Sequence, residues 1–116
     1  MTPDDFIEKA IDRGAREGLY SLDPVEQAIF AVSEAEVYCD MEGIDSLLDR
    51  YGGESTELFA SAFSAVGAVE IAETLRALAA PGVAERDKLL TRANELITAR
   101  SQYSYESIRA LVERQI

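Results

Sequence analysis

The sequence predicts an all-α fold, a compact single-domain bundle of about six helices over residues 1–116. Apolar residues recur at helical spacing along most of the chain, and no run alternates with a period of two for long enough to form a strand. Two segments, Thr2-Pro3 and Asp23-Pro24, place an N-cap residue before a proline, which is typical of a helix start.

The first two predicted helices begin at these two signals. The first has Thr2 as its N-cap and ends near Gly18. The second runs from Pro24 to about Met41. Glu36 lies at the edge of the apolar arc of this second helix. We therefore expect its carboxylate either to pair with an arginine or to lie exposed at a seam between helices.

The stretch over residues 52–78 is predicted to be the centre of the bundle. Apolar residues at helical spacing mark one helix over residues 58–66, and Gly67 separates it from a second helix over residues 68–79. A short helical turn over residues 44–48 precedes this pair. Neither central helix can bury its apolar stripe alone, so the flanking helices should pack around them.

Two further helices complete the prediction. Ala80-Pro81-Gly82 is the clearest break in the chain, and a helix with its apolar stripe over residues 89–97 follows it. Ser104 is the expected N-cap of a last helix, whose stripe extends to Ile116. The predicted core comprises Phe6, Ile29, Val32, Phe59, Phe63, Ile71, Leu75, Leu96 and Leu111.

Acidic residues outnumber basic ones, with 22 Asp and Glu against 11 Lys and Arg and no histidine, for a formal net charge of −11. The excess lies in the first half: residues 1–57 hold 15 acidic and 4 basic residues, whereas residues 58–116 hold 7 of each. Such a charge repels nucleic acid and acidic membranes and attracts basic proteins over about a Debye length. We expect a basic protein partner, DNA-binding or toxin-like, without direct nucleic-acid or membrane contact. The alternative is that the acidity only keeps the protein soluble.

Several kinds of chemistry lack the residues they need. Without histidine, neither a Ser–His or Cys–His nucleophile nor a Cys/His zinc site can be assembled. The single cysteine, Cys39, falls on a buried arc and is expected to be an ordinary core residue. Residues 40–45 resemble a calcium loop only faintly, because the glycine comes too early. We expect no cofactor and no metal. Since neither a signal peptide nor a membrane span is evident, we expect a cytoplasmic location.

Carboxylates of like charge recur at i, i+4 spacing in Glu8/Asp12, Glu36/Asp40 and Asp45/Asp49. Each such pair costs a few tenths of a kcal/mol, so an uncompensated set is either tolerated without consequence or serves a use. Their separation of about 6 Å is comparable to the spacing of phosphates along one DNA strand. The acidic surface that we nominate for binding comprises Glu8, Asp12, Glu26, Glu34, Asp40, Asp45 and Asp49.

The order of motifs over residues 33–78 adds a resemblance. The relevant segments are Glu36-Val37, Glu42-Gly43-Ile44, Asp45-Ser46-Leu47-Leu48, Tyr51-Gly52-Gly53 and Ala65-Val66-Gly67-Ala68. In this order they resemble a bacterial all-helical family typified by a DNA-mimic protein. The resemblance implies an all-helical fold. It also implies an acidic protein that binds a transcription regulator or a nucleoid protein in place of DNA.

We therefore expect a small acidic interaction protein that is not an enzyme, with a DNA mimic as the specific hypothesis. An immunity or antitoxin-like protein that neutralises a basic toxin would use the same electrostatics, and an adjacent gene for a basic toxin would indicate it. An uncharacterised enzyme is the remaining alternative. For that role Glu36 near Tyr38 and Arg50 is the only acid–base candidate.

Overall fold

Seven α-helices form the computed structural model, which describes residues 2–80 and 84–114. They are α1 (Pro3–Glu17), α2 (Pro24–Met41), α3 (Ile44–Tyr51), α4 (Thr56–Ala65), α5 (Val69–Ala79), α6 (Arg86–Ala99) and α7 (Tyr105–Glu113), with 3₁₀ turns η1 (Leu19–Ser21) and η2 (Gly53–Ser55). No strand occurs among these described residues, so the all-α prediction is confirmed there. The structure has more helices than the predicted number of about six, because the predicted short turn over residues 44–48 forms a complete helix, α3.

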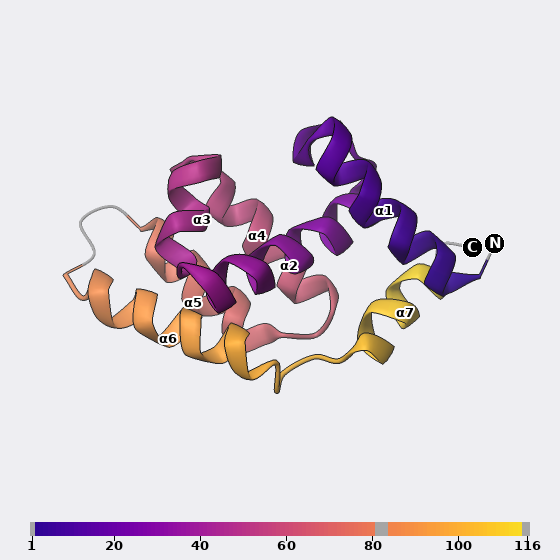
Figure 1. The fold of residues 1–116 in the computed structure, drawn as a ribbon. Coiled ribbons are helices and arrows are strands. Elements are labelled where there is room, and N and C mark those ends of the chain that lie inside the picture. Colours follow the sequence, from indigo (N-terminus) through magenta and orange to yellow (C-terminus); the bar gives the residue numbers. More distant parts are fainter. Residues whose placement is uncertain (1, 81–83, 115–116) are drawn as a thin grey trace.

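Helix α2 runs through the middle of the molecule (Figure 1) and contacts α1, α3, α4, α6 and α7. Four consecutive residues, from Ile29 to Val32, are all buried. Four residues span a full helical turn, so this part of α2 is enclosed on every side. A one-sided apolar stripe does not predict the burial of Phe30, which the structure leaves only 4% exposed.

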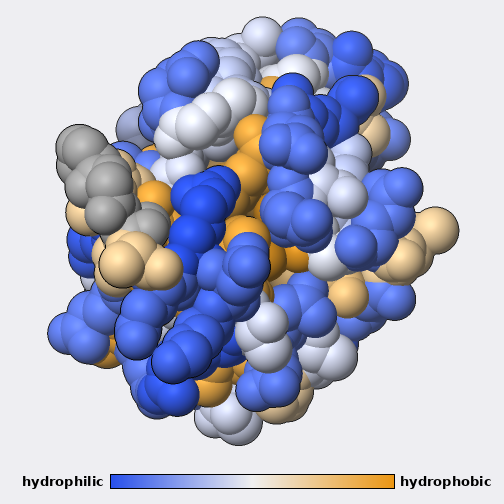
Figure 2. Space-filling view, turned by 90° about the vertical axis from the view of Figure 1, so that its left-hand side faces the viewer, coloured by the Kyte–Doolittle hydropathy of each residue, from blue (hydrophilic) through white to orange (hydrophobic). Residues whose placement is uncertain are grey.

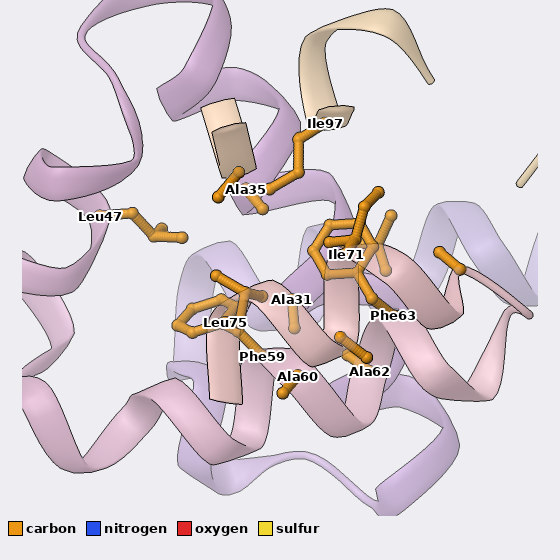
Figure 3. Close-up of a cluster of buried hydrophobic side chains, with 14 of the residues drawn as sticks. Ala31, Ala35, Leu47, Phe59, Ala60, Ala62, Phe63, Ile71, Leu75 and Ile97 are labelled. Atoms are coloured by element: carbon orange, nitrogen blue, oxygen red, sulfur yellow. The ribbon is translucent and has the colours of Figure 1, made fainter. Parts of the chain in front are cut away.

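The predicted central pair is confirmed as α4 and α5, which pack against each other and against their neighbours. Figure 3 shows Phe59 and Phe63 of α4 beside Ile71 and Leu75 of α5, and all four side chains are fully buried. Three predicted core residues are only partly buried at the edge of the hydrophobic clusters, namely Phe6, Leu96 and Leu111. The other six are buried, as predicted.

A second, smaller hydrophobic cluster joins the first and last helices. Ile7 and Ala10 of α1 meet Val112 of α7 and Ile29 of α2. Figure 1 shows α1 and α7 side by side, although they stand at opposite ends of the sequence.

Among the described residues, no helix combines the length and the apolar character needed to cross a membrane.

The helix starts are capped in two different ways. As predicted, the Thr2 and Ser104 hydroxyls accept hydrogen bonds from the backbone N–H groups of Asp5 and Ser107, at 3.1 and 3.3 Å. In α3 and α5 the donors are instead satisfied by distant side chains: Asn94 Oδ1 accepts from Ile44 N–H at 3.2 Å, and Gln102 Oε1 accepts from Ile71 N–H at 3.1 Å. Local sequence cannot reveal such tertiary caps.

The predicted break at Pro81-Gly82 and the predicted core position Ile116 lie outside the described residues.

Gly14 allows α1 to approach α2 closely. A Cβ atom built on Gly14 would lie 2.3 Å from the ring of Phe30. Such a distance is far inside van der Waals contact, so a larger residue would displace the ring or separate the helices.

We therefore predict that Gly14→Ala lowers the free energy of unfolding by about 1–3 kcal/mol, although alanine is the better helix former. Gly53→Ala is the control, because a Cβ at Gly53 meets nothing within 4 Å. Urea denaturation of both variants measures the difference. Equal stability of the two variants would mean that the helix contact adjusts freely.

The burial of Phe63 gives a second test of the core. Phe63→Ala should lower the free energy of unfolding by about 3–5 kcal/mol, because it leaves a cavity between α4 and α5. Val69→Ala, at a position that is 57% exposed, should change stability by no more than about 0.5 kcal/mol. A loss below about 1 kcal/mol for Phe63→Ala, measured by chemical denaturation, would contradict a central role for this ring.

Candidate functional site

The seven residues predicted to form an acidic surface come from three helices. Glu8 and Asp12 lie on α1, Glu26, Glu34 and Asp40 lie on α2, and Asp45 and Asp49 lie on α3. Figure 1 shows α1 and α3 apart from each other, near different ends of the molecule, whose longest dimension is 46 Å. The structure therefore does not gather the seven residues into a single cluster.

Four of these seven carboxylates are engaged by other side chains. Asp12 pairs with Arg16 at 3.1 Å, Glu26 with Arg13 at 2.9 Å and Asp40 with Arg100 at 2.7 Å, and Glu34 accepts a hydrogen bond from the Tyr51 hydroxyl at 2.7 Å. Burial, together with the bond to Glu34, raises the pKa of Tyr51 to about 12. Within the described residues, the other three form no ion pair, namely Glu8, Asp45 and Asp49.

Arginines from the second half of the chain reach carboxylates of the first half. These ion pairs are Arg76–Glu57, Arg100–Glu36, Arg100–Asp40 and Arg109–Asp4. The charge asymmetry along the sequence is therefore partly evened out in space. A negative surface has to be located from the carboxylates that remain without a cation, and not from the half of the chain in which they occur.

Glu36 belongs to a junction between α2 and the segment that joins α6 to α7. Its carboxylate pairs with Arg100 Nε at 3.1 Å and accepts a hydrogen bond from the Tyr103 hydroxyl at 2.5 Å. The Tyr103 ring packs edge-on against Phe63, with the ring centroids 5.6 Å apart. Burial, and then the bond to Glu36, raises the pKa of Tyr103. Of the two alternatives expected for Glu36, the structure shows the pairing with an arginine.

The proposed acid–base grouping of Glu36 with Tyr38 and Arg50 does not form. Glu36 is held by Arg100 and Tyr103 instead, and the Arg50 guanidinium lies 5.7 Å from the ring centroid of Tyr51. Cys39 is buried, as predicted, and burial raises the pKa of its thiol to about 12. The thiol is therefore protonated at neutral pH and is a poor nucleophile.

A groove between the start of α3 and one face of α6 collects carboxylates that have no cation. This α3–α6 groove, of about 460 Å³, is lined by Gly43, Ile44, Asp45, Asp87, Leu90, Thr91, Asn94 and Glu95. Its three acidic side chains, Asp45, Asp87 and Glu95, are exposed and take part in no ion pair among the described residues. Figure 2 shows this end of the molecule, where an apolar band lies between hydrophilic side chains.

Two of the three groove carboxylates, Asp87 and Glu95, were not predicted from the sequence, because residues 58–116 carry no net charge. The spacing of these residues along α6 could have indicated them. Asp87, Thr91 and Glu95 follow one another at i, i+4 and i+8, which places them on one helix face. Only the packing of α3 against α6 brings Asp45 to that face. Over residues 2–80 and 84–114, no group of three or more His, Cys, Asp or Glu side chains is arranged to hold a metal ion.

Comparison with known proteins identifies one related family. A family model described as DMP19-like protein matches residues 20–114, which include α2 to α7 and leave out α1. Neither the curated proteins nor the solved structures contain a match to this chain.

The Tyr103–Glu36 hydrogen bond predicts a measurable contribution to stability. Tyr103→Phe should lower the free energy of unfolding by about 1.5–3 kcal/mol, because the buried ring stays in place while the bond to a charged acceptor is lost. Tyr20→Phe, at a side chain that is 62% exposed, is the control and should have little effect. Chemical denaturation at neutral pH measures both variants, and equal stabilities would show that the bond contributes nothing.

Alkaline pH should weaken the fold. The folded state raises the pKa of Tyr51 from its ordinary value of 10.0 to about 12, and it also raises the pKa of Tyr103. The stabilisation that this proton binding represents is fully present below pH 10 and is lost progressively as the pH rises toward 12 and beyond. Tyr51→Phe should make the decline between pH 10 and 12 shallower in thermal melts. A wild-type stability that stays constant over this window would contradict the assignment.

Proposed function

Because this chain belongs to the DMP19-like protein family, we propose that it is a small acidic interaction protein that binds a basic protein partner. In this proposal it acts by binding and not by catalysis. The observation that carries the proposal is the set of carboxylates left without cations on α3 and α6, in a chain with a net charge of −11. Such a surface raises the rate at which oppositely charged partners meet it.

The more specific proposal is that the protein imitates DNA. Asp45 and Asp49 stand one turn apart on α3 and have no ion-pair partner among the described residues. Two carboxylates about 6 Å apart can engage side chains that otherwise bind neighbouring phosphates. The Glu36/Asp40 pair contributes less, because Arg100 binds both carboxylates. The proposed mimicry therefore centres on α3 and its surroundings.

A capture experiment tests this function. Immobilised protein incubated with bacterial lysate at about 0.1 M salt should enrich DNA-binding proteins, identified by mass spectrometry. Raising the salt to about 1 M shortens the screening length from about 10 Å to about 3 Å, so most of the captured protein should be released. Duplex DNA should compete for the same proteins. Selective capture of a basic toxin would support the immunity alternative, and a lack of basic partners at low salt would leave solubility as the explanation of the acidity.

Charge reversal on α3 adds a test of location. Asp45→Lys combined with Asp49→Lys should abolish capture. Glu73→Lys combined with Glu113→Lys alters the net charge equally at exposed positions elsewhere and should weaken capture much less. Asp40 is left unchanged, because a lysine there would face Arg100 and disturb the junction with Glu36. Circular dichroism should confirm that both variants keep their helices. Equal losses in the two variants would mean that only the total charge matters.

A further inference from the structure

We propose that the α3–α6 groove is the docking site of the partner and that it takes a basic side chain, arginine or lysine, next to an aliphatic one. This inference rests on the proposed function and gives it a place and a recognition chemistry. Its starting point is the combination of an apolar floor, where the partly exposed Leu90 lies over the buried Ile44, with a rim of three exposed carboxylates. A partner segment that is charged but has no apolar side chain would leave the floor exposed to water. A partner segment that is only apolar would leave the three carboxylates without a cation.

The wall of the groove is held in place before any partner arrives. Asn94 of α6 accepts a hydrogen bond from the backbone N–H of Ile44, at the first residue of α3. This bond ties the two sides together, and Ile44 itself is only 2% exposed. A preformed site loses less conformational entropy on binding, so a partner binds it more tightly.

Among the residues that the structure describes, no lysine or arginine lines the groove. Lys88 and Arg92 border a neighbouring hollow on α6, and each is drawn to a carboxylate outside the groove, Lys88 to Glu85 and Arg92 to Glu70. Asp87 and Glu95 also line that hollow, but neither forms an ion pair with Lys88 or Arg92 among the described residues. The groove carboxylates can therefore bind a cation from a partner.

The balance of charge in the groove favours a cation even after the helix dipoles are counted. Asp45 and Asp87 lie in the first turns of α3 and α6, whose N-termini each contribute about half a positive charge. Added to the three negative charges of the carboxylates, these two half charges give the groove a net charge of about −2. Nucleic acid is repelled by this field, and a protein segment with a guanidinium or ammonium group next to an aliphatic side chain satisfies both the rim and the floor.

A synthetic peptide provides the probe. A fluorescein-labelled peptide that repeats Arg-Leu-Ala should bind the wild-type protein, as measured by fluorescence anisotropy. Peptides that repeat Gln-Leu-Ala or Arg-Ser-Ala should each bind at least about tenfold more weakly, because each lacks one of the two recognition elements. Backbone amide NMR signals of Ile44, Asp45, Leu90 and Asn94 should shift on titration. Equal binding of the Arg-Leu-Ala and Arg-Ser-Ala peptides would overturn the proposal, since the floor would then play no part.

Matched variants locate the binding. The combination Asp45→Asn, Asp87→Asn and Glu95→Gln should weaken peptide binding by about tenfold or more. The combination Asp5→Asn, Glu73→Gln and Glu113→Gln removes the same charge from exposed positions elsewhere and should weaken it less than about threefold. Thr91→Arg places a cation in the groove and should block binding, whereas Ser64→Arg on α4 should not.

These results separate the docking site from the general function. If the wild-type protein captures basic proteins in a salt-sensitive way but the two triple variants bind the peptide equally, the groove is not the docking site and the proposed function stands. NMR shifts confined to α1 would likewise overturn the groove. If basic proteins are not captured at all, the function itself fails. Urea denaturation checks that each variant is folded before its binding is compared.

Discussion

The enclosure of α2 is the constraint on which the rest of the structure depends. A helix that is buried around a complete turn, as α2 is from Ile29 to Val32, has no solvated face there and needs neighbours on every side. The α4–α5 pair covers one side, α6 another, and α1 with α7 closes the end near the termini (Figure 1). Gly14 shows how tight this enclosure is, because only the absence of a side chain leaves room for the Phe30 ring.

The same packing redistributes charge. Folding around α2 brings Arg100 against Glu36 and Asp40, and it places Arg109 beside Asp4. Ion pairs at these partly exposed positions contribute little to stability individually. Their larger effect is on the surface potential, since they remove negative charge from α2 and from the start of α1. Negative charge therefore stays uncompensated where packing supplies no cation, and the α3–α6 groove is one such place.

Tertiary caps link the fold to the candidate site. Asn94 accepts from the N–H of Ile44, the first residue of α3, and Gln102 accepts from the N–H of Ile71, the third residue of α5. The N-cap residues Gly43 and Ala68 have no side chain that could do so. Asn94 thereby holds α3 against α6 and fixes the groove between them. The same hydrogen bond lies within the α3–α6 packing that brings Asp45 to the face with Asp87 and Glu95. The Asn94 hydrogen bond thus contributes both to the helix start and to the groove.

Local sequence patterns are sufficient to predict the helices and much of the core. Apolar spacing placed Phe59, Phe63, Ile71 and Leu75 in the interior, and local signals identified the caps at Thr2 and Ser104, because helix periodicity and capping depend on residues within one or two turns. Tertiary structure alone decided the burial of Phe30, the partner of Glu36 and the capping by Asn94. It also decided which carboxylates stay unpaired, since an ion pair depends on distances across the fold that no local pattern encodes. For this reason the sequence alone indicates the net charge and its excess in residues 1–57, whereas packing determines which carboxylates line the α3–α6 groove.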